Sequence, residues 1–204
     1  MKFGPVKVAD AEGAILAHAI ALDGRRLRKG HVVAAEDIRE LKAAGIGEVI
    51  VARLEPGDMS EDEAATRLAA VLGSDNVEVK PAGTGRVNLH AAADGVFRVA
   101  ARLVDAINAV DPAITLATLA DFSAVQRGQM VATVKIIPFA VPCALVARAV
   151  DAAAGGGAIT VQPFAPQRIG VIQTTLPGLK ASILDKTRDV TPARLARMGS
   201  TIVG

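Results

Sequence analysis

Apolar and polar positions in the first 55 residues have the spacing of a small β-rich unit with one helix. The pattern predicts a buried strand over 12–22, a helix over 34–45 and a strand over 48–54. Ile38 and Leu41 face inward on this helix, and Gly45 suits its C-terminal end. We therefore expect residues 1–55 to form a small β/α segment of their own.

A stretch rich in Pro and Gly at 54–59 marks the first predicted domain boundary, and an inserted α+β domain is predicted over 56–165. Ser60 and Glu63 form a capping box for a helix that ends at Gly73. The later periodicity predicts a strand over 95–99, a helix over 100–110, strands over 113–119 and 129–139, a helix over 141–153 and a strand over 158–164. This β-α-β-β-α-β order is that of a ferredoxin-like unit.

The last segment, 166–204, has the pattern of one β-α-β step in a parallel sheet. An apolar strand is predicted over 169–176, Thr191 and Pro192 predict the start of a helix, and a second strand is expected near the end. Two strands leave no covered interior, so we expect the start of a doubly wound α/β sheet in a fragment of a longer protein. The predicted fold class is α/β with an α+β insertion.

Composition narrows the classes of function. The chain has 204 residues, 51% of them hydrophobic, no Trp or Tyr, five Phe and a formal net charge of +2, which argues against nucleic-acid binding. The N-terminus lacks the apolar core of a signal peptide, and no uncharged apolar run reaches the roughly 18 residues of a membrane span. We therefore expect a cytoplasmic protein. Cys143 is interpreted as a small buried hydrophobe, and three scattered histidines indicate no metal site.

The segment Gly83-Thr84-Gly85-Arg86 is the first candidate site. Its backbone N–H groups could form an anion-binding nest, with Arg86 adding a bidentate contact to a phosphate. The alternative is a strand-connecting turn in which the glycines supply positive φ angles. The segment lacks the third glycine of a dinucleotide fingerprint and the Gly-Lys-Ser/Thr ending of a Walker loop.

Two residues of the following strands are further candidates for contact with an anion. Asn88 lies in an alternating run, and Lys135 interrupts an otherwise apolar strand. Lys135 either points to the solvated face or reaches an anion from a buried one, and the mixed character of Thr133 and Ile137 on its own face favours the solvated position. A basic turn in the first segment is predicted to be solvated: Arg25, Arg26, Arg28 and Lys29.

The tail RIGVIQTTLPGLKASILDKTRDVTPARLARMGSTIVG (168–204) resembles the opening of the molybdopterin-binding domain shared by molybdopterin adenylyltransferases and molybdopterin molybdotransferases. In these proteins a first strand of the VGVISTGDEL kind is followed by a loop, an Asp just before the first helix, and a second strand near LGAEVV. RKGHVVAAEDIRELKAAGIGEVIV (28–51) resembles the segment that precedes this domain in the molybdotransferase.

The resemblance implies a ligand site in the tail. Asp185 and Lys186 stand at the family's Asp position, and Thr174 and Thr175 are expected at the carboxyl end of the first strand, where open α/β sheets bind ligands. An Asp before a helix is also an ordinary N-terminal feature. Leu176 replaces the acidic residue of the family's TGDEL motif, so the resemblance implies binding without full transferase chemistry in this chain.

Two function classes remain open. The resemblance implies molybdopterin binding in molybdenum-cofactor biosynthesis or maturation, with no metal held by protein side chains, and with other molybdenum-cofactor proteins or molybdoenzymes as partners. The alternative is a non-catalytic scaffold that binds a partner, or a second copy of the chain, through the inserted domain. No Ser/His/Asp, Cys/His or paired-carboxylate arrangement can be recognised in the spacings. Any transferase activity would belong to a longer chain.

Overall fold

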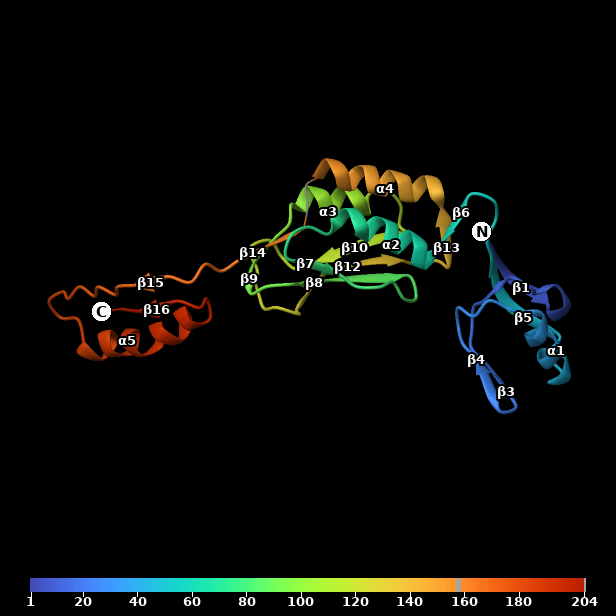
Figure 1. Ribbon diagram of the computed structural model, residues 1–204, viewed down its shortest axis with the longest axis horizontal. Helices are drawn as coiled ribbons and strands as arrows, with labels where there is room; N and C mark the ends of the chain where they lie inside the picture. Colours follow the sequence, from blue (N-terminus) through green and yellow to red (C-terminus); the bar gives the residue numbers. More distant parts are fainter. Residues whose placement is uncertain (157–158, 204) are drawn as a thin grey trace.

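The computed structural model describes residues 1–156 and 159–203, and Figure 1 shows three groups of elements that follow one another along the chain. Helices and strands occur in all three, which confirms the general α/β class. Within the described part of the chain, no helix combines the length and the apolar character that crossing a bilayer requires.

The N-terminal unit (residues 1–55) contains a three-stranded antiparallel sheet and one helix. The sheet has the order β1-β5-β2, and a separate hairpin pairs β3 with β4. The elements are β1 (Lys2–Lys7), the 3-10 helix η1 (Val8–Asp10), β2 (Ile15–Leu16), β3 (Ile20–Leu22), β4 (Arg25–Leu27), α1 (Ala35–Ala43) and β5 (Glu48–Arg53). Ile38 and Leu41 are buried against the sheet, as predicted. The single strand predicted over 12–22 is wrong, because the chain bends at 17–19 and each half pairs with a different strand.

The middle unit (residues 56–165) is built on a four-stranded antiparallel sheet with the order β10-β12-β8-β7. The strands are β6 (Asp58–Ser60), β7 (Val77–Val79), β8 (Arg86–Ala91), β9 (Gly95–Arg98), β10 (Ile114–Thr118), β11 (Ala124–Val125), β12 (Met130–Ile136), β13 (Ala140–Pro142) and β14 (Thr160–Pro163). The helices are α2 (Glu61–Leu72), α3 (Ala101–Asn108) and α4 (Cys143–Gly156). The predicted capping box is present in part: the Glu63 N–H donates to Ser60 Oγ over 3.4 Å, but in the described chain the Glu63 side chain accepts no return bond from the Ser60 N–H.

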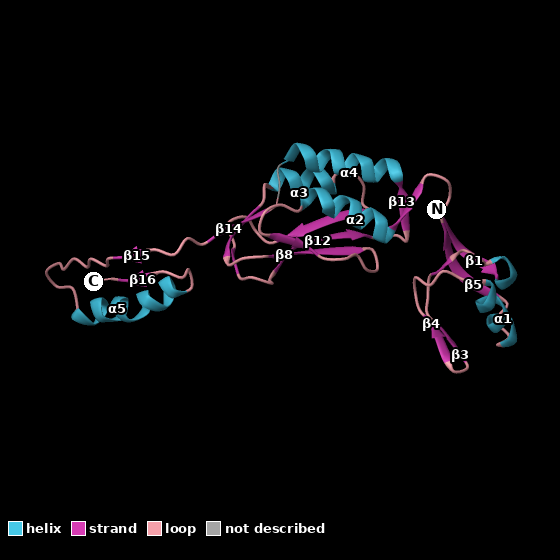
Figure 2. Ribbon diagram, viewed as in Figure 1, coloured by secondary structure: helices cyan, strands magenta, loops and turns pink. Residues whose placement is uncertain are grey.

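All three helices lie on the same face of this sheet, as Figure 2 shows. Alternate strand residues therefore point into one core: Val87 and Leu89 are buried, whereas Arg86 and Asn88 point away from the helices. Leu68, on α2, is among the helix residues that complete the core. Cys143 is partly buried and packs at the edge of this core. No helix of the described residues lies on the opposite face of the sheet.

The strand pairing corrects the predicted ferredoxin-like arrangement. The predicted elements occur in the expected order, with two further short strands, β11 and β13, among them, but the strands separate into different sheets. β9 pairs with β14 and β11 in a three-stranded sheet, and β10 and β12 pair with β8 in the four-stranded sheet. Chain order alone does not decide which strands share hydrogen bonds, and β8, which precedes the predicted unit, takes the place beside β12. Residue 158, the first of the last predicted strand, lies outside the described residues, as does residue 157 before it.

The C-terminal unit (residues 166–203) is a single β-α-β step, as predicted. β15 (Arg168–Ile169) pairs in parallel with β16 (Thr201–Ile202), and α5 (Ala181–Ala196) connects them. The apolar strand predicted over 169–176 is wrong beyond Ile169, because no neighbouring strand pairs with the rest of the segment in the described chain. The helix begins at Ala181 and contains Pro192, so the predicted start at Thr191 is also wrong. Gly204 lies outside the described residues.

Candidate functional site

The uncovered side of the four-stranded sheet holds a group of polar side chains, which we call the open face. They surround a shallow cavity of about 250 Å³. Its lining residues are Arg86 and Asn88 on β8, Thr115 and Ala117 on β10, and Met130, Thr133 and Lys135 on β12. Three of the predicted anion contacts, Arg86, Asn88 and Lys135, are therefore brought together by folding.

The register of the strands places these side chains in two adjacent rows. Thr115 lies opposite Lys135, and Lys135 lies opposite Arg86. In the next row along the sheet, Thr133 lies between Ala117 and Asn88. Directly opposed residues have Cβ atoms about 4.5–5.5 Å apart, so the three members of a row can contact one ligand group.

The first row is positively charged and has no internal counter-ion. Arg86 and Lys135 are both exposed, and among the described residues no carboxylate lies within ion-pair distance of either. Like charges directly opposed on a sheet repel each other, so an anion between them would relieve that repulsion. The predicted solvated position of Lys135 is confirmed.

The second row supplies neutral hydrogen-bonding groups. The Thr133 hydroxyl donates to Asn88 Oδ1 over 2.8 Å, and it also lies 3.4 Å from the Val87 carbonyl oxygen. In the described structure no acceptor pairs with the Asn88 NH2 group, which leaves it free to donate to a ligand. The row can therefore orient a ligand that the cations of the first row attract.

The Gly83–Arg86 segment is a hairpin turn between β7 and β8 rather than an anion-binding nest, with Thr84 and Gly85 as the two loop residues. The Gly83 N–H donates to the Arg86 carbonyl oxygen over 3.0 Å, and the Arg86 N–H donates back over 3.2 Å. Thr84 and Gly85 have φ angles of 52° and 70°, as a type I′ turn requires. The Gly85 N–H is also used, because it donates to Asp62 Oδ1 over 2.7 Å.

The turn is fixed to its neighbours and so sets the position of Arg86 at the start of β8. The Gly85 carbonyl oxygen accepts the Ile136 N–H over 2.7 Å, at the end of β12. Glu61, at the start of α2, packs against Gly85. Burial raises the pKa of Glu61, and the neighbouring Asp62 carboxylate raises it further. Arg86 is therefore held by contacts from both β12 and α2.

The candidates of the C-terminal unit lie on two elements, the loop before α5 and α5 itself, and none of them lines the cavity of the open face. Thr174 and Thr175 are exposed in the loop between β15 and α5. Asp185 lies inside α5 rather than before it, and its Oδ1 accepts a hydrogen bond from Arg188 Nη2 over 2.7 Å. Lys186 is exposed on the same helix. In Figure 1 the segment from β15 to β16 lies apart from β8, β10 and β12.

The N-terminal unit contains a buried ionic cluster that the sequence patterns do not predict. Asp37 is fully buried, pairs with Arg25, and accepts hydrogen bonds from His31 Nε2 over 2.6 Å and from the Ala34 N–H over 2.8 Å. Burial acts to raise the pKa of Asp37, but these hydrogen bonds and the nearby positive charges together lower it. Arg25 is nevertheless exposed, as are Arg26, Arg28 and Lys29, so the predicted solvation of the basic turn is confirmed, and the pairing of Arg25 with Asp37 is an addition to it. Arg25 also bonds Glu40 over 3.2 Å.

The cluster has the features of a structural site. Asp37 occupies the third position of α1. There its carboxylate accepts the backbone N–H of Ala34, the N-cap residue, and so caps the start of the helix. The described residues contain no group of three or more His, Cys, Asp or Glu side chains that could hold a metal ion. The signal in the sequence that could have identified the cluster is Asp37 itself, an acidic residue in the first turn of the predicted helix.

Comparison with known proteins assigns no activity. A family model described as a domain of unknown function (DUF8806) matches residues 5–53, from β1 to the end of β5. Neither the curated proteins nor the solved structures gave a match. The matched range contains the Asp37 cluster and ends before the open face begins.

Proposed function

We propose that the protein binds a small molecule carrying a phosphate group on the open face, and that this ligand is a pterin phosphate of the molybdopterin type. The observation that carries the proposal is the row Thr115, Lys135 and Arg86, which places two unpaired cations and a hydroxyl side by side. The resemblance of the sequence to molybdopterin-binding proteins supports the choice of ligand.

Each side chain has a distinct part in binding. The Arg86 guanidinium can donate two parallel hydrogen bonds to phosphate oxygens, and Lys135 contributes a compact charge beside it. The Thr115 hydroxyl and the Asn88 NH2 group add directional donors at the edge of the charged row. These cations and donors should therefore bind a phosphate group more tightly than a neutral ligand.

The surface next to the cations suits a flat ring. Ala117 and Met130 line the cavity beside the cations, and both also line a neighbouring cavity of about 180 Å³ that continues along β10 and β12. Met130 is 49% exposed, so its thioether is accessible to a ring lying over the sheet. The open face thus suits a ring and a phosphate, whereas Thr174, Thr175, Asp185 and Lys186 line neither of these two cavities.

The proposed activity is binding in the biosynthesis or maturation of the molybdenum cofactor. Arg86, Lys135, Asn88 and the threonines are donors and cations, and none of them is poised as a general base. The open face can therefore hold and present a ligand. Transferase or adenylyltransferase chemistry would need acidic groups that this surface does not supply.

The test is a fluorescence titration of the intact chain with 6-hydroxymethylpterin and with its monophosphate. We expect the monophosphate to bind and the alcohol to bind at least about tenfold more weakly, since charged hydrogen bonds contribute about 1.5–3 kcal/mol each. Arg86→Ala and Lys135→Ala should each weaken monophosphate binding by about tenfold or more. Arg67→Ala and Lys42→Ala, at exposed positions elsewhere, should leave it unchanged.

The outcomes distinguish failure of the proposed site from failure of the proposed ligand. Inorganic pyrophosphate that binds with the same dependence on Arg86 and Lys135, without any gain from the pterin ring, would leave the anion site standing and remove the pterin assignment. Monophosphate binding that survives both substitutions would contradict the open face as the site.

A second candidate function is association with a partner protein, and the C-terminal unit favours it. Large apolar side chains are exposed there: Ile172 is 92% exposed, Leu176 73% and Ile183 51%. Exposed apolar groups gathered in one segment are typical of protein-binding surfaces. Sedimentation velocity of the intact chain and of an Ile172→Asp, Leu176→Asp variant tests self-association. A parent that stays monomeric at all concentrations argues against a homo-oligomer.

A further inference from the structure

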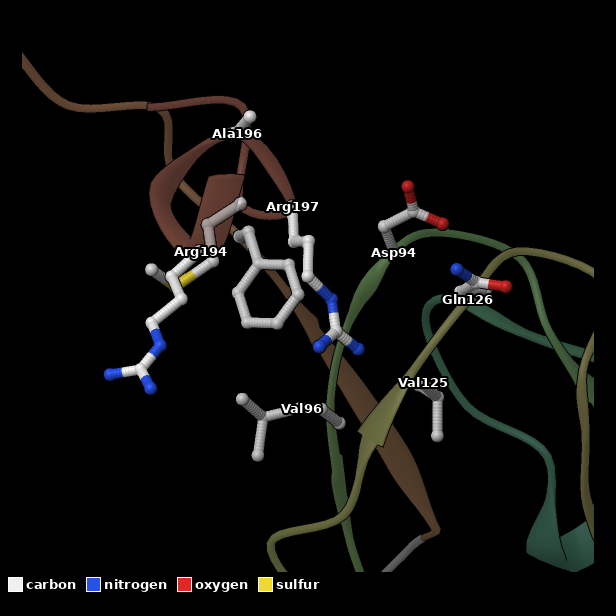
Figure 3. Close-up of a pocket in the computed structure, with 10 residues that line it drawn as sticks. Asp94, Val96, Val125, Gln126, Arg194, Ala196 and Arg197 are labelled. Atoms are coloured by element: carbon white, nitrogen blue, oxygen red, sulfur yellow. The ribbon is translucent and has the colours of Figure 1, made fainter. Parts of the chain in front are cut away.

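A second cavity, of about 470 Å³, lies at the junction of the middle and C-terminal units (Figure 3). One side is formed by β9, β11 and the residues after β14, and the other side by the end of α5. It shares no residue with the open face. Its volume is in the range of sites that accept small organic ligands.

The walls of this cavity are mainly apolar. Val125 is buried, and Val96, Phe164 and Met198 are partly buried around the same space. The Phe164 ring and the Met198 thioether are groups that pack well against a flat ring. The walls therefore favour a ligand with an apolar, planar body.

The charged groups at the cavity favour an anionic ligand. Arg194 and Arg197 both line it, and among the residues that the structure describes neither has a carboxylate within ion-pair distance. Figure 3 shows the Arg197 side chain extending down toward Val96 and Val125, while Arg194 extends to the other side. Asp94 is the one acidic residue of the lining, and its Oδ1 already accepts the Arg127 N–H over 2.7 Å.

From this lining we infer that the cavity binds a small aromatic carboxylate or a similar apolar anion. The apolar body lies against Val96, Val125 and Phe164, and the anionic group pairs with Arg197. The site is independent of the proposed phosphate site, since the two cavities lie on different elements and have different linings. Because the ligand contacts both β9 and the end of α5, its binding also holds the C-terminal unit against the middle unit.

Calorimetric titration of the intact chain with 2-naphthoate tests this inference, with 2-naphthalenemethanol as the neutral analogue. We expect one equivalent of 2-naphthoate to bind, and the alcohol to bind at least about tenfold more weakly. Arg197→Ala removes the charge at an exposed position and should weaken naphthoate binding by about tenfold or more. Arg102→Ala, exposed on α3, is the matched control and should bind as the parent does.

A second variant tests the cavity without changing its charge. Ala124 is exposed, lies on β11 and lines the cavity, so Ala124→Phe should fill the space and abolish binding while the fold is kept. Loss of binding in Arg197→Ala and in Ala124→Phe, but not in Arg102→Ala, supports the site. Equal binding of acid and alcohol, or unchanged binding in either cavity variant, overturns it.

Discussion

Gly85 connects the hairpin turn of the open face to two neighbouring elements. Its φ angle of 70° belongs to the left-handed region, and a Cβ atom at this position would lie 2.7 Å from both Glu61 Oε2 and the Ile136 carbonyl oxygen. The glutamate side chain can move away, but the backbone carbonyl is held in β12. The position therefore requires glycine, and its effect extends to Arg86, the next residue.

We expect Gly85→Ala to lower the free energy of unfolding of the middle unit by about 1–3 kcal/mol, because a non-glycine residue is strained in this conformation. It should also weaken phosphate binding, since Arg86 moves with the turn. Gly83→Ala is the matched control: its Cβ atom meets nothing within 4 Å, and its φ is not positive. Denaturant unfolding of the two variants measures the difference, and equal stabilities would contradict this account of the turn.

Asp37 makes the stability of the N-terminal unit dependent on pH. Its pKa is lower in the folded protein than the ordinary value of 3.8. A carboxyl with a depressed folded pKa contributes stability above its unfolded pKa and loses that contribution as the pH falls through the folded pKa. The contribution should therefore be present at neutral pH and decline below about pH 4.

Asp37→Asn should destabilise the N-terminal unit by about 1–3 kcal/mol at pH 7, because Arg25 and His31 lose a buried charged acceptor. The gap between variant and parent should narrow below about pH 4 as the parent carboxyl becomes protonated. Hydrogen exchange of α1 and β5 amides across this pH range measures both effects. Asp75→Asn, at an exposed position, is the control, and a gap that does not depend on pH would refute the role of the charge.

Among the elements, α5 differs from the other long helices because it has no buried residue. Its stability therefore depends on local interactions along the helix. Thr187 and Thr191 both donate hydroxyl hydrogen bonds to carbonyl oxygens four residues earlier, over 2.9 and 2.6 Å. Pro192 has no N–H to donate to Arg188, which leaves a gap in the backbone ladder.

Pro192→Ala should restore that hydrogen bond and stabilise α5, since an interior proline costs roughly 3 kcal/mol relative to alanine. The expected outcome is slower amide exchange throughout α5, by about tenfold or more, with no change in α2. The measurement is hydrogen exchange of the intact chain. Exchange in α5 that stays the same would show that tertiary contacts, rather than the helix ladder, limit its opening.

On the scale of the whole molecule, the described residues form two hydrophobic cores. The residues of one core come from the segment 8–51, and those of a larger core come from the segment 59–161. The C-terminal unit adds a helix and two short strands that bury little, and the cavity with Arg197 lies where it meets the middle unit. One proposed site thus lies on an uncovered sheet face, and the other lies at a junction where Val125 of the larger core forms part of the wall.

Local features of the fold could be predicted from the sequence. The Ser60 cap, the turn at Gly83–Arg86 and the inward face of α1 all depend on residues within one or two turns of each other. The start of α5 could not be predicted, because Thr191 and Pro192 have the pattern of a helix start but lie inside a longer helix. The residues before Thr191 are also helical, so that α5 begins at Ala181.

The arrangement of the open face depends on residues that lie far apart in the chain. The sequence by itself determined the cap of α2, the turn at Gly83–Arg86 and the inward face of α1, and it showed that Arg86, Asn88 and Lys135 carry groups suited to an anion. Only the tertiary structure decided that β8 lies beside β12, which places Lys135 opposite Arg86 and leaves their face without a helix. The physical reason is that capping and periodicity act within a few residues, whereas strand pairing is settled by hydrogen bonds and packing across the whole core.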